Sequence, residues 1–394
     1  MYSNRVPGVR IPPSPPFKRK ATVITVAFLL YNRFFGNILI SFMNNGIKQN
    51  NLKTPFDIVK NCSPLWKKIF AEAVRDPAEL CRRLEISNEH VDLNSNFPML
   101  VPEPFLQRIK PKDPLDPLLL QVLPRKEESA VSPDFTTDPL GENGHLSPEG
   151  TLSKYHGRSL IVTGKACSIH CRFCFRRHLP LSEIEENNIS SGSGIHPEII
   201  AARFKADPTL HEVILSGGDP LMLSDRKLQK LIFHLDQVPG IRRIRIHTRM
   251  PIIIPQRLTE DLLSSLSNHK RYGKRAKMIV VLHVNHPNEL DSGVSRSIEE
   301  LMDSGCILLS QTVLLRQVND SLPVLAELFE RLIDLGVMPY YLHQLDRVAG
   351  AAHFEVSPEE GCDLITKLRR LLPGYAVPRY VREIPGEPGK VVLK

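Results

Sequence analysis

The chain has 394 residues, of which 42% are apolar and 24% charged, so it can bury a large core and is not globally disordered. Its seven cysteines are too few and too unevenly spaced for a disulfide-stapled secreted domain. The net charge of +8 suggests nucleic acid or an anionic membrane as a partner. However, residues 1–42 contain six Lys and Arg and no acidic residue, which leaves +2 of that charge for the remainder. We therefore expect no nucleic-acid partner for the body of the chain.

The first 42 residues differ in composition from the rest. Residues 5–16 are rich in proline, which disfavours a helix or a central strand. A basic stretch, residues 18–20, precedes an apolar run of about eleven residues, whereas a bilayer span needs about 20. We predict that residues 1–42 are a non-native or disordered extension and that the protein starts at Met43. We also predict a cytoplasmic protein without a membrane anchor.

Residues 43–150 are predicted to form a helical and proline-rich segment. The apolar spacing from Pro55 to about Ile86 is typical of helices, and Asp76-Pro77 favours the start of a second one. Residues 87–150 contain many prolines and turn residues. That composition indicates a wrapping segment or short helices, not a sheet.

From residue 159 onward, β-rich runs and helical patterns alternate. The β-rich runs are Ser159–Thr163, Glu212–Leu215, Ile241–His247, Met278–Val284, Cys306–Leu314 and Met338–Leu345. The helical patterns include Asp225–Gln237, Thr259–Ser267, Val294–Asp303, Pro323–Leu335 and Pro358–Leu372. This order predicts an α/β core over residues 151–372, a partial or complete (β/α) barrel with six units. A doubly wound sheet is the alternative. Residues 373–394 are predicted to form a C-terminal segment, in which Tyr375–Ile384 is an extended tail followed by a Gly/Pro turn and Lys390.

Three cysteines, Cys167, Cys171 and Cys174, form a C-x3-C-x2-C pattern directly after the first predicted strand. Thiolates this close on one loop suit a soft metal or an iron–sulfur cluster. A 4Fe–4S cluster held by three cysteines has one iron free to bind a substrate or cofactor. The alternative is zinc, with His170 or His178 as the fourth ligand.

The cysteine pattern, with Phe173 before its last cysteine, resembles the signature of the radical S-adenosylmethionine superfamily. That resemblance implies a partial (β/α)6 barrel, a 4Fe–4S cluster bound by the three cysteines, and S-adenosylmethionine bound to the open iron. The superfamily also has a glycine pair after its second strand that contacts the methionine moiety. Ser216-Gly217-Gly218-Asp219 stands at that place here.

Further motifs over residues 55–394 resemble the lysine 2,3-aminomutases. They include Lys154-Tyr155-His156-Gly157-Arg158, Cys174-Phe175-Arg176-Arg177-His178, His283-Val284-Asn285-His286-Pro287, Gln311-Thr312-Val313 and Gly386-Glu387-Pro388-Gly389-Lys390. The family implies conversion of L-lysine to β-lysine with pyridoxal phosphate as an additional cofactor. It places the pyridoxal lysine at Lys390, whereas a solvated tail lysine is the alternative interpretation.

The resemblance also assigns the remaining side chains. For pyridoxal phosphate it implies Lys154, Tyr155 and Arg158, because a guanidinium matches a phosphate. For S-adenosylmethionine it implies residues 216–219 together with His283 and Gln311. For lysine it implies Arg176 at the α-carboxylate, and Asp346 and Glu383 at the ε-ammonium. The alternative for Asp346 is a surface salt bridge with Arg347 or Arg382.

Within this family, Glu383 stands where free-lysine aminomutases usually have Asp, and the chain ends at Lys394 without their cysteine-bearing extension. These features are most similar to the branch that β-lysylates elongation factor P. That branch implies elongation factor P and a lysyl-tRNA-synthetase-like ligase as functional partners, and a flavodoxin- or ferredoxin-type reductant. The alternatives are a free-lysine or glutamate 2,3-aminomutase and, with less support, an RNA-modifying radical protein.

Overall fold

The computed structural model describes residues 64–142, 145–178, 195–267 and 276–394. Contacts divide the chain into two units, Met1–Cys62 and Ser63–Lys394, and the description below concerns the second. The predictions made for residues 1–42, for a start at Met43 and for a helix beginning at Pro55 lie outside the described residues. Within the described ranges, no helix combines the length and the apolar character that crossing a membrane requires.

One sheet of nine strands forms the centre of the described unit, and its strands are ordered as they occur along the chain. The strands are β1 (Thr151–Tyr155), β2 (Arg158–Val162), β3 (Glu212–Ser216), β4 (Arg243–Thr248), β5 (Lys277–His283), β6 (Ile307–Val313), β7 (Met338–His343), β8 (Arg379–Arg382) and β9 (Val391–Val392). Strands β2 to β8 pair in parallel, and β1 and β9 are antiparallel edges. A doubly wound sheet reverses its strand order at a switch point, so that alternative is wrong. The α/β partial barrel is confirmed.

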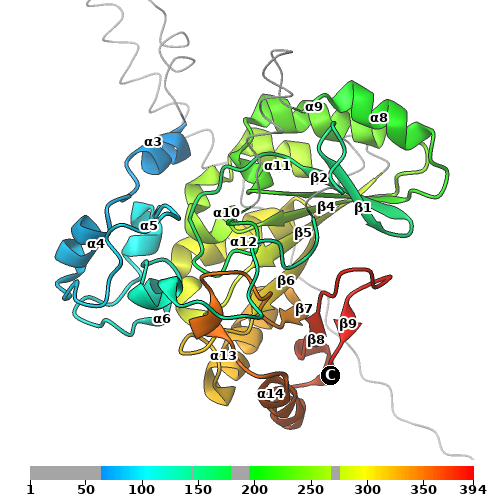
Figure 1. The fold of residues 1–394 in the computed structure, drawn as a ribbon. Helices are drawn as coiled ribbons and strands as arrows, with labels where there is room; N and C mark the ends of the chain where they lie inside the picture. The colour runs from blue at the N-terminus through cyan, green and yellow to red at the C-terminus, as the bar shows by residue number, and fades with distance from the viewer. Residues whose placement is uncertain (1–63, 143–144, 179–194, 268–275) are drawn as a thin grey trace, which may run out of the picture. The chain divides into compact units, whose positions relative to one another are not determined.

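Amphipathic helices follow most strands, and Figure 1 shows them beside the sheet in chain order, from α8 and α9 near β1 to α13 and α14 near β8. They are α8 (Pro197–Lys205), α9 (Asp225–Asp236), α11 (Glu260–Leu266), α12 (Ser292–Asp303), α13 (Leu322–Asp334) and α14 (Pro358–Leu371), with a short α10 (Met250–Ile253) after β4. Helix α13, for example, buries Leu325, Phe329 and Leu332. Five of these helices were predicted to within a few residues, whereas α8 was missed.

The segment before the barrel consists of short helices joined by long connections, as its prolines indicate. The helices are α3 (Leu65–Ala71), α4 (Pro77–Leu84), α5 (Glu103–Leu106), α6 (Pro117–Leu120) and a 3-10 turn at Lys126–Ser129. The carboxylate of Asp76 accepts a hydrogen bond from the backbone N–H of Ala78, so the predicted helix start is confirmed. Phe105 and Leu118 are fully buried in the same core as the barrel strands.

The structure corrects one prediction at the C-terminal end of the barrel and adds a strand at its N-terminal end. The run Tyr375–Ile384 is not simply a tail, because β8 within it pairs in parallel with β7 and buries Tyr380 and Val381. The alternation pattern missed this strand because it is only four residues long. Strand β1 was also missed; it forms a hairpin with β2 through Gly157, which has a φ of +74°.

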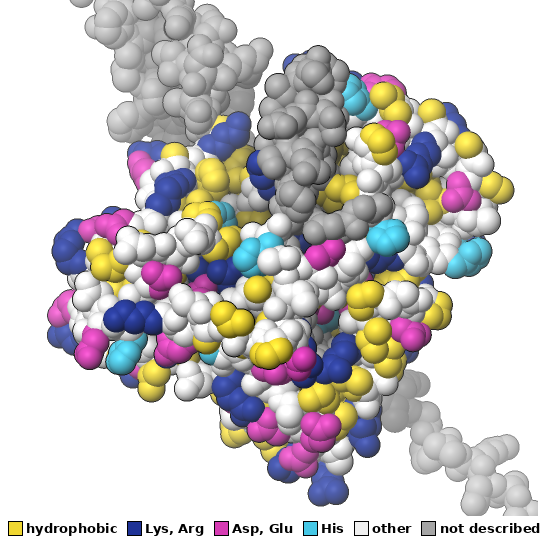
Figure 2. All heavy atoms as spheres, in the orientation of Figure 1, with side chains coloured by type: hydrophobic (Ala, Val, Ile, Leu, Met, Phe, Trp, Pro, Cys, Tyr) yellow, Lys and Arg dark blue, Asp and Glu magenta, His cyan; other side chains and the backbone are white. Residues whose placement is uncertain are grey.

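Basic and acidic side chains are mixed on the visible face of the described unit (Figure 2). Figure 2 shows Lys and Arg side chains interspersed with Asp and Glu over that face. The described unit also has exposed ion pairs, such as Arg316 with Glu360 at 2.7 Å. This distribution agrees with the nearly neutral charge of the chain beyond residue 42.

Candidate active site

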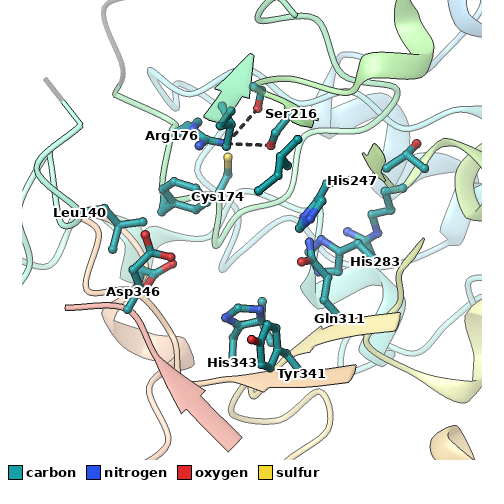
Figure 3. Close-up of a pocket in the computed structure, with 18 of the residues that line it drawn as sticks. Leu140, Cys174, Arg176, Ser216, His247, His283, Gln311, Tyr341, His343 and Asp346 are labelled. Carbon is teal, nitrogen blue, oxygen red and sulfur yellow. Dashed lines mark hydrogen bonds between the residues drawn. The ribbon is translucent and has the colours of Figure 1, made fainter. Parts of the chain in front are cut away.

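A cavity of about 480 Å³ opens where the parallel strands end, and residues from the carboxyl ends of β3 to β7 line it. Every residue to which a role was assigned from the sequence lies in its wall. These are Lys154, Tyr155, Arg158, Cys167, Cys171, Cys174, Arg176, Ser216, Gly217, Gly218, Asp219, His283, Gln311, Asp346, Glu383 and Lys390. Figure 3 shows side chains from opposite walls, among them Arg176, His247 and Asp346, surrounding one open space. The fold thus brings together groups that are more than 200 residues apart.

The three cysteines of the predicted metal loop lie together in one wall of the cavity. Burial raises the pKa of Cys174 to about 11, and burial followed by the neighbouring thiols raises that of Cys167 well above its ordinary value. The Sγ of Cys171 accepts a hydrogen bond of 2.8 Å from the Arg249 guanidinium. A soft metal centre binds thiolates, so its binding would release protons from these groups. The donor set therefore fits an iron–sulfur cluster.

The two histidines considered as zinc ligands are turned to other partners. The Nδ1 of His170 lies 2.9 Å from the carbonyl of Pro98, and the Nε2 of His178 lies 3.0 Å from that of Ala349. Neither ring lines the cavity. Among the described residues, no three His, Cys, Asp or Glu converge on one metal-ion position, which a structural zinc site requires. Ligands bound to different irons of one cluster lie farther apart than the ligands of a single ion, so this finding is compatible with a cluster.

A buried ion cluster holds the cysteine loop against the N-terminal segment. Arg172, inside the loop, is fully buried and donates to both carboxylate oxygens of Glu128 at 2.7 and 2.6 Å. Arg177 also donates to Glu128, at 2.8 Å. A second bond joins the Arg172 backbone N–H to the carbonyl of Gln121 at 2.9 Å. The N-terminal segment therefore fixes the position of the loop.

The glycine pair after β3 allows the cysteine loop to approach closely. A Cβ at Gly218 would lie 2.4 Å from the carbonyl oxygen of Ala166, and Gly217 has a φ of +106°. The Gly218 N–H donates to the carbonyl of Gly164 at 2.6 Å. Only glycine fits such an approach, so the structure requires glycine at these two positions independently of the predicted contact with S-adenosylmethionine.

Asp219 uses both carboxylate oxygens inside the protein. One accepts from the Thr248 hydroxyl at 2.7 Å, and the other from the backbone N–H groups of Arg249 and Met250 at 2.8 and 3.0 Å. The side chain thereby joins the glycine turn to the end of β4. Its predicted contact with S-adenosylmethionine remains a prediction.

Three histidines, His247 in β4, His283 in β5 and His343 in β7, line the cavity near the carboxyl ends of their strands. His283 and Gln311 are register partners at the ends of β5 and β6, as the resemblance implies for two residues of one cofactor site. Burial, assisted by the positive charge of Arg249, lowers the pKa of His283 to about 3. Burial also lowers the pKa values of His247 and His343 far below the ordinary range. Sequence reasoning missed His247 and His343, because a single histidine in a strand has no spacing signal.

A chain of alternating charges runs from the cysteine loop to the C-terminal segment. Arg176 donates to Glu142 at 2.7 and 3.0 Å. Lys154 lies 3.1 Å from Glu142 and 3.3 Å from Glu383, which in turn binds the Lys390 ammonium. Burial alone would raise the pKa of Glu383, but Lys390 and Lys154 outweigh it and lower that pKa to about 2. Glu142 was not identified from the sequence.

Two alternative interpretations are wrong in this geometry. Lys390 is not a solvated tail lysine, since its side chain is 22% exposed and its amine lines the cavity beside Glu383. Asp346 does not pair with Arg347, which binds Glu355 at 2.8 Å. Within the described ranges no ion pair involves Asp346, and burial raises the pKa of its carboxyl to about 7, although Lys390 opposes this. Its carboxyl is therefore available to a cationic ligand.

Several donors of the cavity wall also have no protein partner. Arg245 Nε and His247 Nε2 are buried and make no hydrogen bond with any described residue. The Arg158 guanidinium lies over the ring of Tyr155, 5.5 Å from its centroid. A buried polar atom without a partner is costly, so these donors fit a cavity that binds a polar, anionic ligand such as a phosphorylated cofactor.

The fold and the site define an open α/β-barrel enzyme with a thiol loop at its mouth. No family model matches the chain. It is 43% identical over 333 residues to the L-lysine 2,3-aminomutase of Escherichia coli, covering 83% of this chain and 94% of that protein. For the Haemophilus influenzae and Buchnera aphidicola enzymes of the same name the identities are 38% and 37%, covering 83% and 85% of this chain and 95% and 97% of those proteins.

The chain belongs to the L-lysine 2,3-aminomutase family and is an isomerase, so the family resemblance of the motifs is confirmed. A solved radical S-adenosylmethionine methyltransferase from Sphaerobacter thermophilus is also similar, with a TM-score of 0.38 and 20% identity, covering 59% of this chain and 68% of that one. A similarity of that degree is too small to argue from.

Proposed function

We propose that this protein is a radical S-adenosylmethionine enzyme that rearranges (S)-α-lysine to (R)-β-lysine with pyridoxal phosphate. The observation that carries the proposal is the single cavity that joins the cysteine loop to Lys390 and the Asp346 carboxyl. When bound, the reduced cluster with S-adenosylmethionine supplies a 5′-deoxyadenosyl radical, and pyridoxal phosphate supplies a ring that stabilises the migrating nitrogen. The protein must hold these groups and the substrate in reacting geometry.

In this proposal, each cofactor is bound by one part of the cavity wall. The three cysteines hold the cluster, and residues 216–219 with His283 and Gln311 hold S-adenosylmethionine. Lys390 provides the amine for pyridoxal phosphate. The phosphate of this cofactor is held by Lys154, Tyr155 and Arg158. Arg245 is a further candidate donor through its Nε, which has no partner among the described residues, while its terminal nitrogen pairs with Glu212 at 2.6 Å.

The substrate is held at both ends in this proposal. Arg176 binds the α-carboxylate from the side of the cysteine loop, and Asp346 binds the ε-ammonium. Glu383 binds the Lys390 ammonium in this structure. When the Lys390 amine engages pyridoxal phosphate, Glu383 becomes free to bind the ε-ammonium of the substrate. A fixed lysine presents only its β-hydrogen to the radical.

We further propose that the β-lysine is used to modify elongation factor P through a lysyl-tRNA-synthetase-like ligase, with a flavodoxin- or ferredoxin-type protein as reductant. Glu383 in place of the usual aspartate supports this branch. The test is anaerobic incubation of the protein with S-adenosylmethionine, pyridoxal phosphate, dithionite and lysine, followed by chiral analysis. We expect (R)-β-lysine; product from glutamate but not lysine would contradict the proposal. Transfer to elongation factor P is then assayed by adding the ligase and measuring the mass of the factor.

A further inference from the structure

The structure assigns Glu142 as a positioning residue for the substrate carboxylate, an inference that rests on the proposed role of Arg176. Glu142 lies in the cavity wall with only 8% of its side chain exposed. Its two oxygens meet the Nε and one terminal nitrogen of the Arg176 guanidinium at 2.7 and 3.0 Å. The pair is therefore bidentate and buried, the geometry that fixes a guanidinium plane most firmly.

A guanidinium has two edges that can each bind a carboxylate with two hydrogen bonds. Glu142 occupies the edge formed by Nε and one terminal nitrogen. The other terminal nitrogen donates to the Ser216 hydroxyl at 3.2 Å and lies 3.5 Å from the carbonyl of Gly217. Figure 3 shows Arg176 beside Ser216, with the hydrogen bond between them drawn as a dashed line. The end-on edge of Arg176 is thus the edge that no carboxylate of the described residues occupies, and a substrate carboxylate bound there would share or replace the contacts with Ser216 and Gly217.

Glu142 is itself held in place from a second side. Lys154 lies 3.1 Å from its Oε1, and the Glu142 backbone N–H donates to Asp138 at 2.9 Å. Displacement of this carboxylate by substrate would break its ion pairs with Arg176 and Lys154 and leave the buried Glu142 without a cation, which is unfavourable. We therefore expect Glu142 to stay on Arg176 when lysine binds, so that the carboxylate of the substrate always meets the same edge.

In this arrangement the orientation of Arg176 depends on Glu142, whereas the attraction of the substrate carboxylate depends on the net positive charge of the group. Arg176, Glu142 and Lys154 together carry one positive charge, and removal of Glu142 adds a second. The substrate carboxylate would still be attracted, yet Arg176 would be free to rotate and to present either edge. A misplacement of about 1 Å can cost roughly 100-fold in rate. The loss should therefore appear in kcat and not in the affinity for lysine.

The test compares Glu142→Ala with wild type and with Glu149→Ala, which removes a surface partner of Arg203. We expect kcat for β-lysine formation to fall about 10- to 100-fold in Glu142→Ala. The affinity for lysine, measured from the absorbance of the pyridoxal-loaded protein, should not weaken. Alanine leaves a space that matches acetate, so we expect added acetate, but not chloride at the same ionic strength, to restore part of kcat. Wild type and Glu149→Ala should not respond to acetate.

The outcomes distinguish this inference from the proposed function. An inactive wild type would contradict the proposed function and this inference with it. An active wild type combined with a fully active Glu142→Ala, with no acetate response, or with weakened lysine affinity at unchanged kcat would overturn the inference alone. If Glu142→Ala does not fold, Glu142→Gln keeps the shape and removes the charge. Its kcat should then fall without loss of lysine affinity, and wild-type kcat in Glu142→Gln would overturn the inference.

Discussion

At one end of the cavity three thiols stand on a single loop, residues 167–174, whereas at the other end the charged groups come from two distant parts of the chain. Glu142 and Lys154 lie before and within β1, and Glu383 and Lys390 lie between β8 and β9. These groups meet only because β1, β8 and β9 complete the sheet. The thiol end therefore depends on local spacing plus one clamp, the Glu128 ion cluster. The charged end depends on correct assembly of both sheet edges.

Removal of one cysteine ligand at the thiol end should abolish cluster binding completely. Cys171→Ala is expected to abolish the brown colour and the cleavage of S-adenosylmethionine, because two thiolates do not hold a cluster that three normally bind. Iron and sulfide content and 5′-deoxyadenosine formation measure this loss. Cys362→Ala, which removes a cysteine outside the cavity, is the control and should keep both properties. Wild-type iron content in Cys171→Ala would contradict the assignment.

A substitution at the charged end should abolish lysine rearrangement, whereas the cluster at the thiol end should still form. Lys390→Ala is expected to keep wild-type iron content and to lose lysine rearrangement by at least about 1000-fold, since no amine remains for pyridoxal phosphate. Lys394→Ala, an exposed lysine four residues later, is the control. Normal turnover in Lys390→Ala would refute the assignment, and loss of iron in that variant would show that the two ends are not independent.

The clamp behind the thiol end should contribute mainly to stability. Glu128→Ala leaves Arg172, which is fully buried, and Arg177 without their carboxylate partner. Breaking such a buried pair costs about 3–5 kcal/mol. Urea unfolding should therefore show a loss of that size, whereas Glu149→Ala at the surface should change the free energy of unfolding by less than about 1 kcal/mol. An equal effect of the two substitutions would contradict the clamp.

The same contrast explains what the sequence could predict. Strand β6 was predicted as Cys306–Leu314 and is observed as Ile307–Val313, because regular strand–helix alternation is a local signal. The metal loop is local too. Strand β1 and the pairing of β8 within the sheet were missed, since short edge elements have little periodicity of their own.

Residues that act through distant partners were missed for a related reason. Glu142 acts on Arg176, and Arg249 bonds to Gln121 at 2.6 Å, across 128 positions of the sequence. No spacing rule connects such residues before the chain is folded. The resemblance to a family supplied the roles of Arg176, Asp346 and Lys390, but it named only residues that contact ligands and not those that hold them in place.

The smallest expected effect concerns the pH dependence at the charged end. Burial raises the pKa of Asp346 from 3.8 to about 7. The folded protein therefore binds this proton more tightly than the unfolded chain does, and the resulting stability is complete below pH 4 and is lost as the pH rises through 7. A shift of this size corresponds to roughly 4 kcal/mol, and we expect about 1–2 kcal/mol because the side chain keeps some exposure. Asp346→Asn does not titrate, so it should gain stability relative to wild type from pH 5 to pH 8.

Activity should move in the opposite direction at the same group. The ionised carboxylate is the proposed partner of the ε-ammonium, so lysine binding by wild type should strengthen as the pH rises from 6 to 8. Asp346→Asn should bind lysine weakly at every pH in that interval. Urea unfolding and lysine titration at each pH measure the two effects. If the stability difference between Asp346→Asn and wild type did not change with pH, the Asp346 carboxyl would not titrate in this interval, and the charged end would have a fixed charge instead of one that changes near neutral pH.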